Sequence, residues 1–95
     1  MKDDLSTEIH KLLTIRYKNR TDITSIKVTK LVSTYRIYFT IQLKPGQKRS
    51  GIRFIDGIWL WDVRKLLKSV FNINSGYVNV INNFDEYKHH NDGIY

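Results

Sequence analysis

Apolar and polar residues alternate through the segment from Tyr35 to Leu43, and this alternation most limits how the 95-residue chain can fold. Because successive side chains of a strand point to opposite faces, a repeat of two predicts a strand with one buried face. The β-branched and aromatic residues in the segment favour the same interpretation. The apolar positions are Tyr35, Ile37, Phe39, Ile41 and Leu43.

The flanking segments predict further strands. Upstream, Ile26, Val28 and Val32 share one parity and indicate a strand that precedes Tyr35. Downstream, Pro45-Gly46 suits the two central positions of a type II turn. This turn leads to an expected third strand at about residues 50–55, which would close a three-stranded meander.

Two segments repeat apolar residues at helical spacing: residues 4 to about 18 and residues 63 to 71. Asp3 or Asp4 is placed to cap the first helix. The start of the second helix has two interpretations. Asp56-Gly57 suits a hairpin turn, which would make residues 58–61 a short fourth strand and Asp62 the helix cap. Alternatively, Asp56 itself starts the helix.

The length allows one compact domain. Residues 77–81 form the last expected strand, and residues 82–95 lack periodicity and are expected to be a loosely ordered tail. Residues 1–81 are therefore predicted to form a single α+β domain in which two helices pack on one face of an antiparallel sheet of three to five strands. The predicted order is α-β-β-β-(β)-α-β.

Composition excludes several classes of function. The chain has no cysteine, so disulfides, thiolate zinc sites and cysteine nucleophiles are absent. The first residues are acidic and do not resemble a signal peptide, and the longest apolar run, residues 58–61, is far shorter than the roughly 20 residues that cross a bilayer. We expect a cytoplasmic protein without membrane association, metal or cofactor.

The net charge of +7 is unevenly distributed along the chain. Both ends are acidic, whereas the segment from Lys11 to Arg53 contains a single acidic residue, Asp22. Such a basic segment attracts a polyanion, and nucleic acid is the expected one. A solvated basic surface that only aids solubility is the alternative. The segment's basic residues are Lys11, Arg16, Lys18, Arg20, Lys27, Lys30, Arg36, Lys44, Lys48, Arg49 and Arg53.

The alternation of side chains along the expected strands predicts where the polyanion binds. If the alternating apolar residues are buried, the polar residues between them share the opposite sheet face, and a basic turn follows. These side chains can neutralise phosphate, hydrogen-bond to base edges and stack on bases. The alternative is an ordinary solvated sheet face. The predicted nucleic-acid-binding residues are Lys27, Thr29, Arg36, Tyr38, Thr40, Gln42, Lys44, Lys48, Arg49 and Arg53.

The second helix offers a possible secondary face of one aromatic and three basic residues, Trp61, Arg64, Lys65 and Lys68. This face would contact DNA or a protein partner. In the other interpretation, Trp61 completes the small core and its basic neighbours are merely solvated. A protein-interaction module or inhibitor from a phage or mobile element, anchored by aromatic residues, is the alternative function. Its candidate anchors are Trp59, Trp61, Phe84, Tyr87 and Tyr95.

Catalytic patterns are scarce, and no enzyme is expected. The exception is a small ribonuclease toxin that works with Arg36, Tyr38 and Arg53 on one face. A homodimer is a possible assembly, because a chain of this size has little surface for an operator-sized DNA site.

Two family resemblances bear on the choice of nucleic acid. The order helix, three-stranded meander, helix over residues 4 to 71 resembles the double-stranded-RNA-binding domain, although residues 63–68 echo that family's lysine-rich helix start only distantly. The size, the composition rich in Lys, Ile and Asn, and a wing at residues 52–61 around Asp56-Gly57 resemble small winged-helix-like DNA-binding accessory proteins of Gram-positive conjugative plasmids and related mobile elements. The second resemblance implies double-stranded DNA rather than RNA as the ligand.

Overall fold

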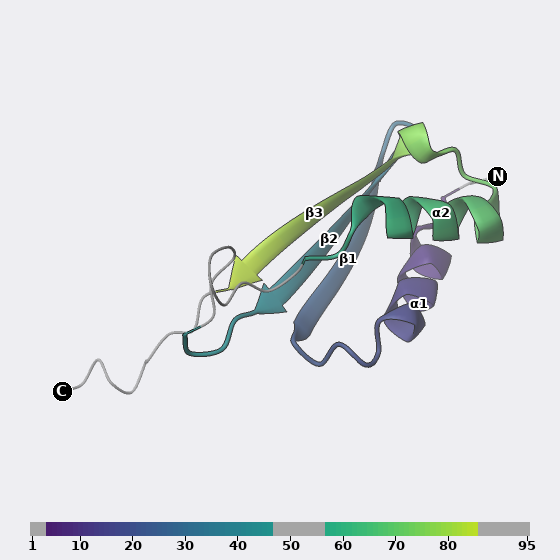
Figure 1. Ribbon diagram of the computed structural model, residues 1–95. Helices are drawn as coiled ribbons and strands as arrows, with labels where there is room; N and C mark the ends of the chain where they lie inside the picture. The colour runs from purple at the N-terminus through teal and green to yellow at the C-terminus, as the bar shows by residue number, and fades with distance from the viewer. Residues whose placement is uncertain (1–3, 47–56, 86–95) are drawn as a thin grey trace.

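The computed structural model describes residues 4–46 and 57–85. Two helices and a three-stranded sheet make up this part of the chain, so the expected α+β class is confirmed (Figure 1). The elements are α1 (Ser6–Arg16), β1 (Ile23–Leu31), β2 (Thr34–Gln42), α2 (Leu60–Phe71), the short 3-10 helix η1 (Ser75–Tyr77) and β3 (Val78–Asp85). The predicted strand at residues 50–55 lies outside the described residues.

The sheet is mixed, with strand order β1-β2-β3. β1 and β2 form the expected antiparallel hairpin, but β3 runs parallel to β2, so the expectation of a wholly antiparallel sheet is wrong for this strand. The reason lies in the connection. The chain leaves β2 at one end of the sheet and returns to the other end through α2, as the crossover between parallel strands requires.

Both helices cover the same face of the sheet (Figure 1). The alternating residues of β2 are buried there, as the sequence predicted, against Ile9 and Leu13 of α1 and Val63 and Leu67 of α2. These four helical side chains are fully inaccessible to solvent. Removing each of them from water stabilises the domain by roughly 1.5 to 3 kcal/mol. No helix of residues 4–46 and 57–85 lies on the opposite face of the sheet.

The start of α2 differs from both interpretations of the sequence. The helix begins at Leu60, so residues 58–61 are not a strand, and the helix does not begin at Asp56. Trp59 occupies the position before the helix, with an extended backbone and no side-chain cap. Asp62 lies inside the first turn and therefore is not the cap, although its charge still suits the helix dipole.

The last strand continues beyond its predicted end. β3 extends to Asp85, so residues 82–85 belong to the sheet and not to a loose tail. Their pairing with β2 provides the order that local sequence did not indicate: Phe84 lies opposite Ile41 and packs against the core. Residues 86–95 lie outside the described residues.

Candidate nucleic-acid interface

The face of the sheet opposite the helices, which we call the open face, carries mostly polar residues, contributed by all three strands. Its composition follows from the register, because directly paired residues point to the same side of a sheet. Lys27 pairs with Tyr38, and Tyr38 pairs in turn with Ile81 of β3. The open-face residues are Ser25, Lys27, Thr29, Leu31, Thr34, Arg36, Tyr38, Thr40, Gln42, Asn79, Ile81, Asn83 and Asp85.

Six of the predicted binding residues therefore share one face, as expected: Lys27, Thr29, Arg36, Tyr38, Thr40 and Gln42. Lys27 and Arg36 are exposed, and both are neighbours of Tyr38: Lys27 pairs with it from β1, and Arg36 precedes it by two residues on β2. Arg36 stands in the next row of the register, between Thr29 of β1 and Asn79 of β3. Two cations and one aromatic ring thus lie close together, in the two adjacent rows of the sheet that contain Tyr38 and Arg36.

Lys27 and Arg36 have no hydrogen-bonding or ionic partner among the described residues. The other arginines described do have partners. Arg16 lies 3.4 Å from Asp62, and Arg20 forms two hydrogen bonds of 2.9 Å with Asp22. In the part of the chain that the structure describes, the two cations of the open face are therefore not engaged in internal contacts.

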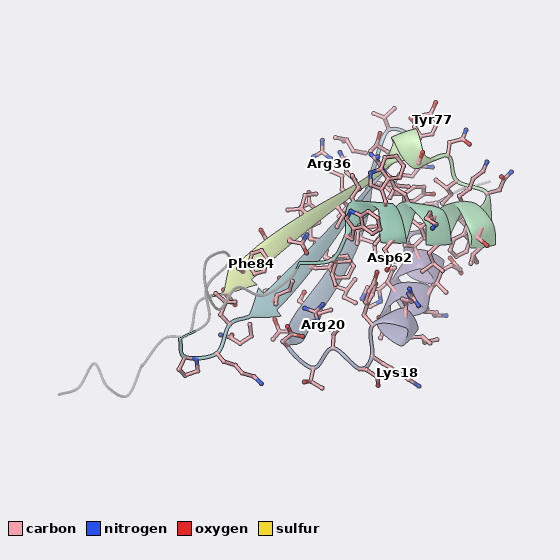
Figure 2. The ribbon with its side chains drawn as sticks, viewed as in Figure 1. Lys18, Arg20, Arg36, Asp62, Tyr77 and Phe84 are labelled. Atoms are coloured by element: carbon pink, nitrogen blue, oxygen red, sulfur yellow. The ribbon has the colours of Figure 1, made fainter. Side chains whose placement is uncertain are left out.

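Acidic charge on the open face is confined to one end. Asp85 pairs with Gln42 in the last row, whereas Arg36 lies toward the opposite end, close to η1 (Figure 2). The Gln42 amide donates to the backbone oxygens of Leu43 and Asp85, at 3.0 and 3.1 Å. The Gln42 side chain thus links β2 to the end of β3, and its amide hydrogens already bond to backbone oxygens in the free protein.

The basic turn after β2 is described only in part. Lys44 is exposed, and Gly46 has a φ of 84°, the positive value that the predicted type II turn requires of its second central residue. The positive charge of Lys44 helps to lower the pKa of Asp22, so Lys44 contributes to a local charge cluster. The remaining predicted residues of this region, Lys48, Arg49 and Arg53, lie outside the described residues.

The possible secondary face on α2 has its cations largely engaged in structural contacts. Arg64 donates to the backbone oxygen of Val78 at 2.9 Å, and its guanidinium lies 4.8 Å from the centre of the Trp61 ring. The Lys68 ammonium donates to the side-chain oxygens of Asn72 and Asn74, which follow the end of α2.

The two other residues of that secondary face point to solvent. Trp61 is 47% exposed, so it does not complete the core, and Lys65 is exposed as well. Trp59, which precedes the helix, is 67% exposed. Of the predicted secondary face, Trp61 and Lys65 are the residues most accessible to a partner.

Sequence reasoning missed the contribution of β3 to the open face. Asn79, Ile81 and Asn83 join it because the strand runs parallel to β2 in this register. Their alternation with Val78, Val80 and Asn82 is visible in the sequence, but it does not say which strand they neighbour.

Other kinds of site find no support in this part of the chain. Within residues 4–46 and 57–85, no three His, Asp or Glu side chains are grouped so that they could hold a metal ion. The helices described there are too short and too polar to cross a membrane. No protein-family model matches the sequence, and comparison with curated proteins and with solved structures gives no significant match.

Proposed function

We propose that this protein binds nucleic acid through the open face, with double-stranded DNA as its ligand. The observation that carries the proposal is that Lys27 and Arg36 are exposed, unpartnered among the described residues and both adjacent to Tyr38 on the open face. An exposed cation that makes no internal contact can turn toward a phosphate without breaking an interaction of the free protein, and it releases counterions from the nucleic acid. The basic segment from Lys11 to Arg53 adds a field that attracts the same ligand.

The open-face residues divide into two roles. Lys27 supplies a flexible point charge for phosphate, and Arg36 supplies a planar fork that suits either phosphate or a guanine edge. Thr29 and Asn79, on either side of Arg36, add hydrogen-bonding groups in the same row. The half-buried ring of Tyr38 offers an aromatic surface next to both cations.

Salt-dependent binding tests the proposal. We expect the affinity for a DNA duplex to fall linearly on a log-log plot against salt, with a slope of about −0.9 per neutralised phosphate. The variant Lys27→Ala/Arg36→Ala should weaken binding by at least tenfold and make the slope shallower by about 2.

A matched control separates site from bulk charge. Lys11 of α1 and Lys18, which follows α1, are exposed and their side chains have no partner among the described residues, so Lys11→Ala/Lys18→Ala removes the same charge at a distance from the open face. Equal losses in both double variants would argue against the open face as the site. Competition by single-stranded DNA and by duplex RNA determines which nucleic acid is preferred.

A protein-interaction module is the second candidate, because Trp59 and Trp61 both expose large apolar surfaces at the start of α2. Exposed tryptophans are frequent anchors of protein interfaces. The variant Trp61→Ala distinguishes the two functions. Full DNA binding together with loss of a protein partner would support the interaction module.

A further inference from the structure

The tip of the β1–β2 hairpin exposes two apolar side chains. Leu31 and Thr34 are the last pair of the ladder, and Val32 and Ser33 form the two-residue loop between them. Leu31 is 53% exposed and Val32 is 90% exposed. The sequence predicted Val32 to belong to the strand on its buried parity, and the structure corrects this: the residue projects from the end of the sheet.

The backbone at this tip is strained. Val32 has a φ of 59°, which side chains branched at Cβ rarely adopt. Two-residue hairpin loops normally use Gly, Asn or Asp at such a position. A polar or glycine residue at position 32 would therefore relieve the strain and would also be better hydrated. Strained residues of this kind concentrate at functional sites.

The surroundings of the tip suit a nucleic-acid ligand. η1 ends at the same end of the sheet, and its Tyr77 is 46% exposed there (Figures 1 and 2). Arg36, the unpartnered cation of the open face, follows the tip by two residues on β2. The ammonium of Lys30 lies on the other side of the ladder, 5.3 Å from the centre of the Tyr35 ring. Apolar side chains thus project beyond a pair of cations.

We propose that Leu31 and Val32 form an apolar wedge that enters between stacked base pairs of the duplex held by the open face. Proteins that bend DNA insert Leu, Ile, Phe, Met or Pro side chains between base steps and recover the cost of unstacking through wider contact. Insertion of the wedge would kink the bound duplex, and this inference rests on the proposed function. Cations behind the tip hold the phosphates on either side of the opened step.

Fluorescence of 2-aminopurine tests the wedge, because unstacking this base raises its emission. The probe is a duplex of about 20 base pairs with several TA steps, which open most easily, and with 2-aminopurine in place of adenine at those steps. We expect the wild-type protein to raise the emission at least twofold. Donor and acceptor dyes on the two duplex ends should report a shorter distance in the complex.

The variants Leu31→Thr and Val32→Gly remove apolar surface and no charge. Thr suits a strand and Gly suits the positive φ, so both variants are expected to fold. They should abolish the increase in emission while the salt slope of binding stays as in the wild type.

The outcomes that would overturn the wedge also show whether nucleic-acid binding itself fails. Salt-dependent binding with unchanged emission, or with equal emission in the variants, overturns the wedge and leaves the proposed function standing. Absence of salt-dependent binding overturns both. A dimer that dissociates in Leu31→Thr and Val32→Gly, without any unstacking, would assign the tip to self-association instead.

Discussion

The Tyr17 hydroxyl donates a hydrogen bond of 2.8 Å to the Asp62 carboxylate and thereby joins the end of α1 to the first turn of α2. The two residues are 45 positions apart in the chain. The Tyr17 ring also packs edge-on against Phe39 of β2, with ring centres 5.5 Å apart. One side chain thus connects both helices and the central strand, on the face of the sheet opposite the proposed interface.

Replacing Tyr17 by Phe is expected to lower the free energy of unfolding by about 1 kcal/mol. The ring keeps its contact with Phe39, so the loss reports the hydrogen bond to Asp62 alone. The site is half-buried, which places the effect below that of a fully buried bond to a charged group. Urea denaturation followed by tryptophan fluorescence measures it. A variant as stable as the wild type would show that this bond does not hold the helices together.

Stability is also expected to fall at alkaline pH through the same residue. Burial, followed by the hydrogen bond to Asp62 and its negative charge, raises the pKa of Tyr17 above the ordinary value of about 10. Above that pH the unfolded chain releases the tyrosine proton while the folded protein keeps it, so stability that is complete below about pH 10 declines as the pH rises further. Denaturant midpoints between about pH 8 and 11 should fall more steeply in the wild type than in Tyr17→Phe. Parallel curves would contradict the expectation.

The sheet faces were predictable from sequence because side chains alternate along a strand. The repeat from Tyr35 to Leu43 predicts which residues of β2 are buried, and the same parity places Lys27 and Arg36 together on the open face. The apolar spacing from Val63 to Phe71 likewise predicts the core-facing side of α2. In these elements local periodicity and tertiary burial agree.

The direction of β3, the position of the hairpin loop and the start of α2 were not predictable, because they depend on contacts between segments that are distant in the sequence. Nothing local distinguishes a parallel β3 from an antiparallel one. The hairpin loop at Val32-Ser33 lacks the glycine or asparagine that usually marks such a turn, so the strand was expected to include Val32. At α2, Asp56 and Asp62 both suggested a helix start, yet the helix begins at Leu60 without a side-chain cap.

The Asn82 side chain is expected to be essential for the segment that leads into α2. Its amide accepts from the Ile58 backbone N–H at 2.8 Å and donates to the Ile58 carbonyl at 3.0 Å, as a neighbouring strand would. Asn82→Ala should cost about 1 to 2 kcal/mol of unfolding free energy, since it leaves both backbone groups of the buried Ile58 unsatisfied. Asn82→Asp should cost at least as much, because a carboxylate cannot donate to the carbonyl.

Two further variants define that prediction. Asn83, on the opposite face, is exposed and its side chain makes no hydrogen bond to the described residues, so Asn83→Ala should change stability by less than about 0.5 kcal/mol. A Cβ at Gly57 would lie 2.9 Å from the Asn82 side-chain carbon, so Gly57→Ala should displace the amide and destabilise the protein as well. Equal losses of stability in Asn82→Ala and Asn83→Ala would show that the two hydrogen bonds between the Asn82 side chain and the Ile58 backbone do not stabilise the protein.

Acid should weaken the start of β1. Hydrogen bonds from Arg20, together with its positive charge, hold the pKa of Asp22 below the usual value, against the smaller opposing effect of burial. Asp22 therefore adds stability above about pH 4, which is lost as the pH falls through its folded-state pKa. Asp22→Asn should lower stability by about 1 kcal/mol at neutral pH, a value reduced by the partial exposure of Arg20. The difference from the wild type should disappear near pH 2, and a constant difference across the acid range would contradict this assignment.

Replacing Val32 by Gly is expected to stabilise the protein, although it removes a large side chain. The positive φ of 59° costs a β-branched residue about 1 to 2 kcal/mol, and glycine avoids this cost. Glycine loses more backbone entropy on folding, about 0.5 to 1 kcal/mol, so the net gain should be about 0.5 to 1 kcal/mol. Ser33→Gly is the matched control, because Ser33 lies in the same loop without a positive φ and its replacement carries only the entropic cost. Thermal unfolding should therefore place the midpoint of Val32→Gly above, and that of Ser33→Gly below, the wild type. Destabilisation of both variants to the same extent would mean that Val32 adopts its backbone conformation without strain, and the stability cost attributed to the exposed tip would then be absent.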